Sequence, residues 1–135
     1  MLKRFAAIFY AVISLPVVIF QVALAAGMPL GAFAMGGASP GQFPPSLRSA
    51  ALVQAVLLVL LALVVLARAG IILPGWSRAS RRLIWLVVAF TALSLILNLI
   101  TPSAGERALW APVAFLMLLS SGMVALTASS KEVVQ

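Results

Sequence analysis

Residues 47–67 read LRSAALVQAVLLVLLALVVLA, a run of Leu, Val and Ala that only Arg48, Ser49 and Gln54 interrupt. A helix rises about 1.5 Å per residue, so a helix of this length covers the hydrocarbon thickness of a bilayer, about 30 Å. Comparable apolar runs occupy residues 5–26, 83–100 and 108–127. The sequence therefore predicts an all-α membrane protein in which four transmembrane helices form a bundle.

The overall composition agrees with this architecture. Of the 135 residues, 64% are hydrophobic and 8% are charged, and the mean hydropathy is +1.23. A soluble domain is only about half apolar, and a soluble fold could not cover so much apolar surface. Because spans of about 20 residues leave only short connections, we expect residues 1–135 to form a single membrane domain.

The basic residues predict the orientation of the helices. Most of them lie before the first apolar run, between the second and the third, or after the fourth. These seven of the nine basic residues are Lys3, Arg4, Arg68, Arg78, Arg81, Arg82 and Lys131. Because segments rich in Lys and Arg stay in the cytoplasm, both termini and the connection between residues 68 and 82 should be cytoplasmic. Arg48 and Arg107 then lie on the outer side.

The first apolar run has a second interpretation. Lys3 and Arg4 precede it, and residues 23–25, Ala-Leu-Ala, match the cleavage site of a secretory signal peptide. However, the run is longer than the roughly 7 to 15 residues of a signal core, which favours a retained first span. From the sequence, both interpretations stay open.

Composition also limits the chemistry and the partners. The net charge is +7, but these charges flank membrane spans. They therefore favour anionic lipid head groups as partners and not nucleic acid. The chain contains no Cys, His or Asp, which excludes disulfides, thiol redox chemistry and most metal and acid–base sites. We therefore expect no enzymatic activity, no catalytic residues, no metal site and no cofactor.

The connection between the first and second runs, residues 27–46, is rich in Gly and Pro and carries no charge. Gly and Pro disfavour a regular helix, yet residues such as Met28, Phe33 and Phe43 are too apolar for a freely solvated linker. We expect this loop to fold back onto the outer end of the bundle, because protein or water must satisfy irregular backbone there. It is either a lid over a ligand or a compact connection that shields helix ends.

Polar side chains concentrate in the outer half of the predicted bundle. Gln21 lies late in the first span, Gln54 lies early in the second, and Asn98 lies at the end of the third. Together with the outer charged residues, they form the predicted ligand-binding site: Gln21, Arg48, Gln54, Asn98, Glu106 and Arg107. The alternative is that the amides only join helices through hydrogen bonds, which contribute about 0.6 kcal/mol each.

Glu106 has two further interpretations. The segment from Ser103 to Glu106 fits a capping box, in which the Ser103 hydroxyl accepts a hydrogen bond from a helix amide and the carboxylate reaches back. Alternatively, Glu106 pairs with Arg48 across the outer mouth of the bundle, where partial burial would strengthen the pair. The sequence does not choose between these roles.

Three segments carry a resemblance to a known group of proteins. Residues 43–48 read FPPSLR, residues 98–103 read NLITPS, and residues 106–112 read ERALWAP. With the Gly/Pro-rich loop, they make the chain resemble a family of small, uncharacterised bacterial integral membrane proteins with four spans. The resemblance covers nearly the full length and implies location in the bacterial cytoplasmic (inner) membrane. It implies an architecture and no activity.

The remaining function classes differ in what they require. A proton- or cation-coupled transporter usually places an ionisable group inside a span, and these runs carry none deep inside. We therefore expect a small non-enzymatic integral membrane protein that binds a lipid or a protein partner at its outer face. The alternative is a small transporter or channel formed by a homo-oligomer. A polar path to both faces would favour the transporter, and a dry inner half would favour binding.

Overall fold

The computed structural model describes residues 2–134 and, within them, the side chains of residues 2–127. The chain forms four long helices, α1 (Leu2–Ala25), α2 (Pro45–Arg68), α3 (Ser77–Ile100) and α4 (Ala104–Val134). Each is long and apolar enough to cross a bilayer, which confirms the predicted four-helix membrane bundle. Lys131, which the orientation prediction includes, has its side chain outside the described part of the chain.

Local sequence explains where the helices begin and end. Pro45 occupies the first turn of α2, where its fixed φ suits a helix and its missing amide has no intrahelical partner to lose. α1 stops before Gly27, which has a φ of +96°. The amides of Gly27 and Met28 donate to the carbonyls of Leu24 and Ala23, 3.1 and 3.0 Å away, and so cap the last turn. α3 starts at Ser77, earlier than the predicted residue 83, and therefore includes Arg81 and its basic neighbours.

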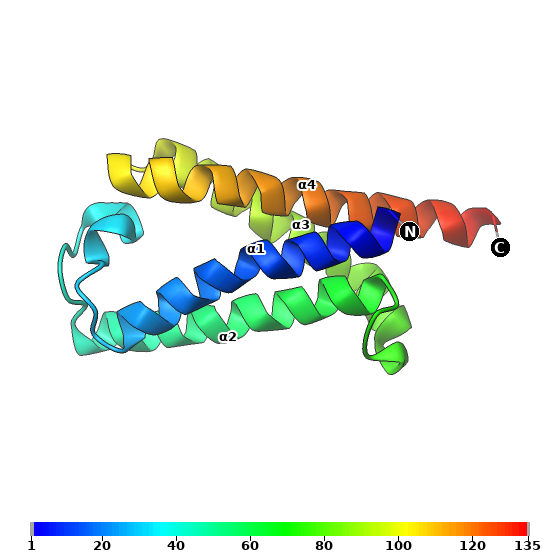
Figure 1. Cartoon of the computed structure of the whole chain (residues 1–135), viewed down its shortest axis with the longest axis horizontal. Coiled ribbons are helices and arrows are strands. Elements are labelled where there is room, and N and C mark those ends of the chain that lie inside the picture. The colour runs from blue at the N-terminus through cyan, green and yellow to red at the C-terminus, as the bar shows by residue number, and fades with distance from the viewer. Residues whose placement is uncertain (1, 135) are drawn as a thin grey trace.

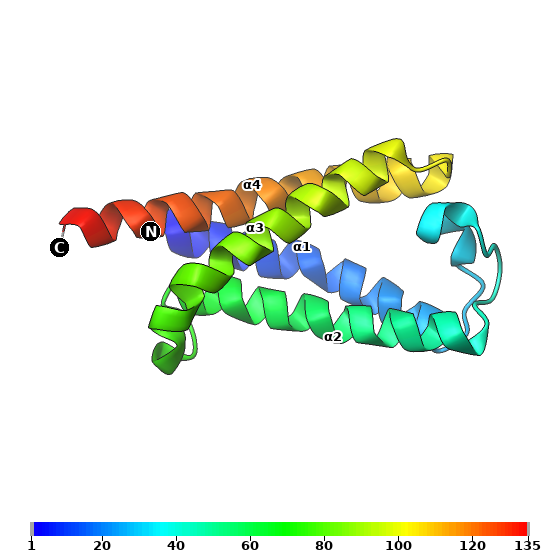
Figure 2. The same cartoon turned by 180° about the vertical axis from the view of Figure 1, so that it is seen from behind.

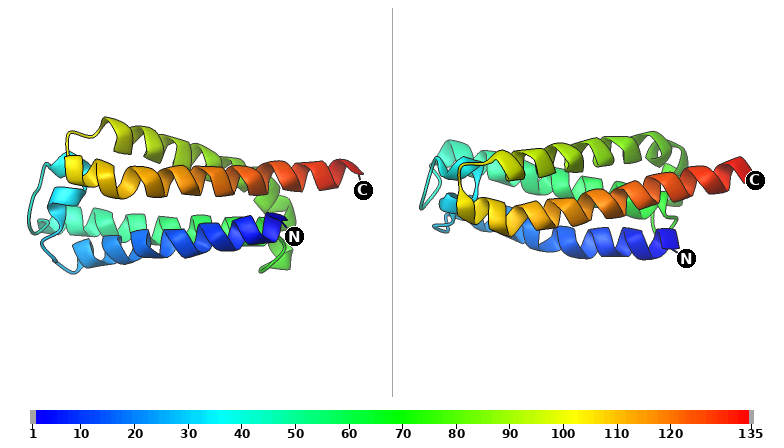
Figure 3. Two further views of the ribbon diagram at one scale, coloured as in Figure 1. Left: turned by 45° about the horizontal axis from the view of Figure 1, so that its top comes forward. Right: turned by 90° about the horizontal axis from the view of Figure 1, so that it is seen from above.

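The helices form two antiparallel hairpins, α1–α2 and α3–α4 (Figure 1). α1 also packs along α4, whereas α2 and α3 lie close only at one end and separate toward the other (Figure 2). The connection between α1 and α2 contains two short 3-10 turns, η1 (Gly31–Phe33) and η2 (Met35–Gly37), and lies across the end where the hairpins separate (Figure 3). We name this end the loop end. The opposite end, which carries η3 (Pro74–Trp76), is named the packed end.

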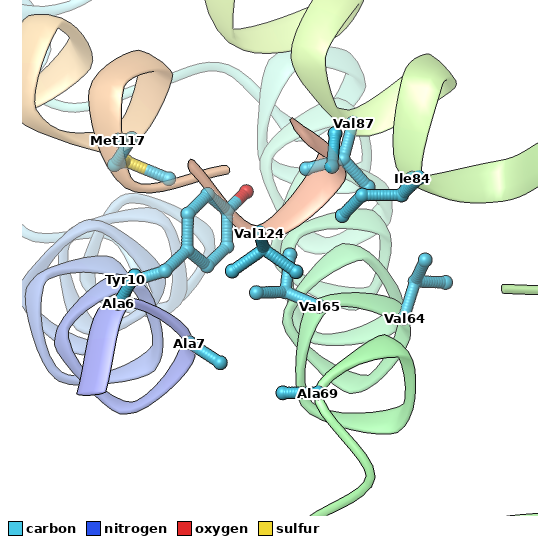
Figure 4. Close-up of a cluster of buried hydrophobic side chains, with 11 residues drawn as sticks. Ala6, Ala7, Tyr10, Val64, Val65, Ala69, Ile84, Val87, Met117 and Val124 are labelled. Atoms are coloured by element: carbon cyan, nitrogen blue, oxygen red, sulfur yellow. The ribbon is translucent and has the colours of Figure 1, made fainter. Parts of the chain in front are cut away.

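The packed end is filled by apolar side chains from all four helices (Figure 4). Ala6 and Ala7 let α1 approach its neighbours closely, since small side chains permit close helix contact. Tyr10 is fully buried beside them, and its hydroxyl has no hydrogen-bond partner in the described part of the chain. The larger core cluster therefore lies at the packed end, and a second, smaller one lies at the loop end: Phe20, Leu24, Ala34, Phe43 and Ala51.

Candidate functional site

The Gly/Pro-rich loop packs on the loop end, as predicted, and hydrogen bonds to α4 and the preceding turn hold it there. The Ser103 hydroxyl donates to the carbonyl of Ala32 over 2.8 Å, and the indole N–H of Trp110 donates to the carbonyl of Phe33 over 3.1 Å. The backbone amide of Gly36 donates to a Glu106 carboxylate oxygen over 2.8 Å. These contacts join residues about seventy positions apart and close the loop over the bundle.

A cavity of about 660 Å³ lies beneath the loop, between the separated hairpins. All four helices line it; on α2 the lining stripe runs from Leu47 to Leu58. Eleven residues of helix rise about 16 Å, which is about half of the hydrocarbon thickness of a bilayer. Ala50 on α2 and Leu97 on α3 line the cavity and are also exposed. The cavity therefore opens sideways between α2 and α3, where these helices separate.

The cavity collects most of the predicted site residues. Gln21, Gln54, Asn98 and Glu106 all line it. Arg48 and Arg107 lie outside the lining, but each holds a residue of the wall: Arg48 Nε donates to the carbonyl of Phe43 over 2.9 Å, and Arg107 Nη2 to that of Thr101 over 2.8 Å. The structure thus places four of the six predicted residues in one cavity and the other two beside it.

The amides do not form the hydrogen bonds between helices that the alternative interpretation predicted. Asn98 Nδ2 donates to the carbonyl of Ser94 on its own helix over 2.7 Å. Within the described part of the chain, no hydrogen bond involves the side chain of Gln21 or that of Gln54. Both are partly exposed and line the cavity, so their donors and acceptors are available to a ligand or to water.

Glu106 fulfils one of its predicted roles in part and has a further role that the sequence did not show. Its amide donates to the Ser103 hydroxyl over 3.1 Å, so the first half of the capping box is confirmed. The carboxylate does not reach back to Ser103: one oxygen accepts hydrogen bonds from Gly36 and from the Thr101 hydroxyl, at 2.8 and 3.0 Å. The predicted pair with Arg48 is wrong, because the Arg48 guanidinium turns to the Phe43 carbonyl. Glu106 therefore fastens the loop.

The electrostatics of the wall are simple. Among the described residues, Glu106 is the only charged side chain that lines the cavity, and neither Lys nor Arg does. The hydroxyl of Thr91, deeper in the wall, donates to its own helix at Val88 over 2.9 Å. The cavity is thus apolar with a few amides and hydroxyls, as is typical of sites for small apolar ligands.

Sequence reasoning missed the aromatic part of the site. Phe20 on α1 and Trp110 on α4 have their ring centroids 4.7 Å apart and both line the cavity. Trp110 belongs by its position to the outer end of the predicted bundle, but nothing in the sequence links it with Phe20. Gly36 was equally hidden, because its contribution is a backbone amide. The chain matches no protein-family model, no curated protein and no solved structure. The site is therefore interpreted from its own geometry.

Proposed function

We propose that this chain is a small, non-enzymatic integral membrane protein that binds a lipid in the cavity at its loop end. One feature carries the proposal: a largely apolar cavity of about 660 Å³ whose wall includes exposed residues of two membrane helices, Ala50 on α2 and Leu97 on α3, from which we infer a side opening. This volume lies within the range of sites that enclose small ligands, about 300 to 1,000 Å³. A side opening of this kind faces the acyl chains of the bilayer, which makes lipid the most available occupant.

A protein partner is the less favoured occupant. Enclosure beneath a loop suits a chain-like ligand better than a flat protein surface, since protein interfaces are broad and bury on the order of 800 Å² on each partner. The enzymatic alternative gains no support from the site either. Glu106 is the one carboxylate in the described wall, and one of its oxygens already accepts two hydrogen bonds.

The homo-oligomeric transporter or channel is the second candidate. It needs a polar path across the membrane, and the apolar cluster around Tyr10 and Val65 fills the packed end. This packing favours binding over transport. The orientation is part of the proposal: the loop end faces away from the cytoplasm in a bacterial inner membrane, with both termini cytoplasmic, because of the basic residues near the packed end.

Cysteine labelling tests the orientation, since the natural chain has no cysteine. Ala38→Cys lies in the exposed loop and Gly75→Cys in the exposed turn η3. A maleimide that cannot cross membranes should label Ala38→Cys on intact cells and should label Gly75→Cys only after lysis. The reverse pattern would place the loop end in the cytoplasm.

Fluorescence quenching tests lipid binding in the cavity. Replacing Trp76 and Trp85 by Phe leaves Trp110, which lines the cavity, as the single tryptophan. In vesicles of phosphatidylcholine brominated in the acyl chain, Ala50→Phe should lower the quenching of Trp110 because it fills the cavity mouth. Val53→Phe is the matched control: it lies on the same helix, is 68% exposed and does not line the cavity. Equal quenching in all three proteins would contradict lipid binding and direct the search to a protein partner.

A further inference from the structure

Three polar side chains of the cavity wall have unused hydrogen-bonding groups. Gln21 on α1, Gln54 on α2 and Ser94 on α3 all line the cavity, and none of these side chains takes part in a hydrogen bond within the described part of the chain. Asn98, which also lines the cavity, donates its Nδ2 hydrogen to the Ser94 carbonyl. The unused groups therefore come from three helices that surround the same space.

Two of these groups lie at the depth of the acyl chains. Gln54 is nine residues into α2, about 14 Å along the helix axis, and Ser94 is six residues before the end of α3, about 9 Å. Each of these helices has 24 residues. Centred in the bilayer, such a helix extends beyond the hydrocarbon by only about 3 Å at each end. Both side chains therefore lie below the layer that phosphate groups occupy.

An acyl chain alone does not satisfy these groups. Methylene groups offer neither donors nor acceptors, and a polar group that is shielded from water without a partner is costly. A carboxamide offers N–H donors and a carbonyl acceptor, and a hydroxyl donates or accepts. Ester carbonyls and hydroxyl groups complement this set. The wall therefore favours an occupant that carries uncharged oxygen atoms down to the level of Gln54.

Charge determines which head group can accompany these oxygen atoms. Among the described residues, the wall contains the Glu106 carboxylate and no basic side chain. Glu106 lies in the first turn of α4, where the helix amides favour a negative charge, and it already accepts two hydrogen bonds. It therefore needs no cation from a ligand. A phosphate in the cavity would be desolvated, would lack a cationic partner and would face a like charge.

We propose that the cavity prefers an uncharged glycerolipid, such as diacylglycerol, whose ester carbonyls and hydroxyl contact Gln21, Gln54 and Ser94 beneath the loop. This rests on the proposed function, which requires only that some lipid occupies the cavity. A phospholipid meets that requirement with an acyl chain alone, because its phosphate stays at the membrane surface and keeps its ester carbonyls nearby. The inference adds the class of lipid and the side chains that select it.

Retention in the cavity has to be separated from attraction to the protein surface. Arg48 and Arg107 lie at the loop end, outside the lining, and a basic residue near a membrane surface favours anionic lipid about fivefold. This attraction acts against the proposed preference. Ala50→Phe fills the mouth of the cavity and leaves the surface charge unchanged, so the retention that it abolishes belongs to the cavity. Val53→Phe, outside the lining, is the matched control.

The experiment is native mass spectrometry of the full chain released from micelles. These contain equal amounts of diacylglycerol, phosphatidylglycerol and dialkylglycerol with the same chain lengths. The second probe adds a phosphoglycerol group, and the third lacks both ester carbonyls. Within the retention that Ala50→Phe abolishes, diacylglycerol should exceed phosphatidylglycerol at least about tenfold. It should exceed dialkylglycerol at least about fivefold, because the ether leaves shielded amides unpaired.

A double substitution tests the two amides. In a Gln21→Leu, Gln54→Leu variant, diacylglycerol and dialkylglycerol should be retained equally, because neither amide remains to distinguish an ester from an ether. Asn98→Leu is the control: it removes an amide from the same wall, but one that already donates to the Ser94 carbonyl. This control should keep the preference for the ester.

The outcomes distinguish this inference from the proposed function. Equal cavity retention of diacylglycerol and phosphatidylglycerol, or a preference for the phospholipid, would overturn the selection of an uncharged head group and leave lipid binding intact. An ester preference that persists in the Gln21→Leu, Gln54→Leu variant would overturn the role of the two amides. Retention that Ala50→Phe does not alter would overturn the cavity as the lipid site, and with it the proposed function.

Discussion

Replacing Glu106 by Gln should loosen the loop without unfolding the helices. The Glu106 carboxylate accepts hydrogen bonds from the Gly36 amide and the Thr101 hydroxyl, at 2.8 and 3.0 Å. Hydrogen bonds to a charged acceptor contribute about 1.5 to 3 kcal/mol, and neutral ones contribute about 0.5 to 1.5 kcal/mol. Glutamine keeps an acceptor oxygen, so the Gly36 contact should lose about 1 to 1.5 kcal/mol.

Hydrogen exchange at the Gly36 amide measures this loss directly. An amide in a local opening equilibrium exchanges about five- to tenfold faster when its closed state is destabilised by that amount. The amides in the middle of α2 and α3 should keep their rates, because they depend on global unfolding. Arg107→Gln is the control, since its side chain bonds to the Thr101 carbonyl and not to Gly36. An unchanged rate at Gly36 in Glu106→Gln would refute the role of the carboxylate in fastening the loop.

The same variant also tests whether the loop matters for binding. Membrane insertion should be intact, because Glu106 lies outside the apolar core of the spans. Lipid retention should be lower in Glu106→Gln than in the wild type, because the closed loop covers the cavity. Unchanged retention together with faster exchange at Gly36 would leave the carboxylate with a role in loop docking only.

Three other substitutions test the packing around the site. Ser103→Ala removes the hydroxyl that accepts a hydrogen bond from the Glu106 amide and donates one to the Ala32 carbonyl. It should lower the free energy of unfolding in detergent by about 1 to 2 kcal/mol. Gly105→Ala would place a Cβ 2.7 Å from the ring of Phe33, so the loop must shift, and protease cleavage within residues 27–44 should become faster with the helices intact. Tyr10→Phe removes a buried hydroxyl that has no partner in the described part of the chain, and it should raise the free energy of unfolding by about 1 kcal/mol; a loss of stability would reveal a partner for that hydroxyl.

Much of the fold was predictable because the bilayer fixes the length of a helix and requires backbone groups to be satisfied within it. The apolar run at residues 47–67 therefore predicts α2 (Pro45–Arg68) to within two residues of its ends. The polar side chains that would share the loop end were predictable too, since depth follows from position along a span. Their partners were not. Glu106 contacts a backbone amide 70 residues away, and no side-chain pattern marks an amide donor. The cavity was equally hidden, because its volume depends on how far α2 and α3 separate.

That separation has a physical origin in the side chains at the two ends of the bundle. At the packed end, Val64 and Val65 of α2 meet Ile84 and Val87 of α3 in one buried cluster. Toward the loop end, Phe20 and Trp110 connect α1 with α4 across 4.7 Å, but the residues that α2 and α3 direct there, Ala50 and Leu97 among them, are exposed. One seam is thus closed by aromatic rings while the other stays open to the bilayer. A single large side chain on the open seam, as in Ala50→Phe, should therefore block entry to the cavity while leaving the stability of the bundle almost unchanged, because it displaces no buried neighbour.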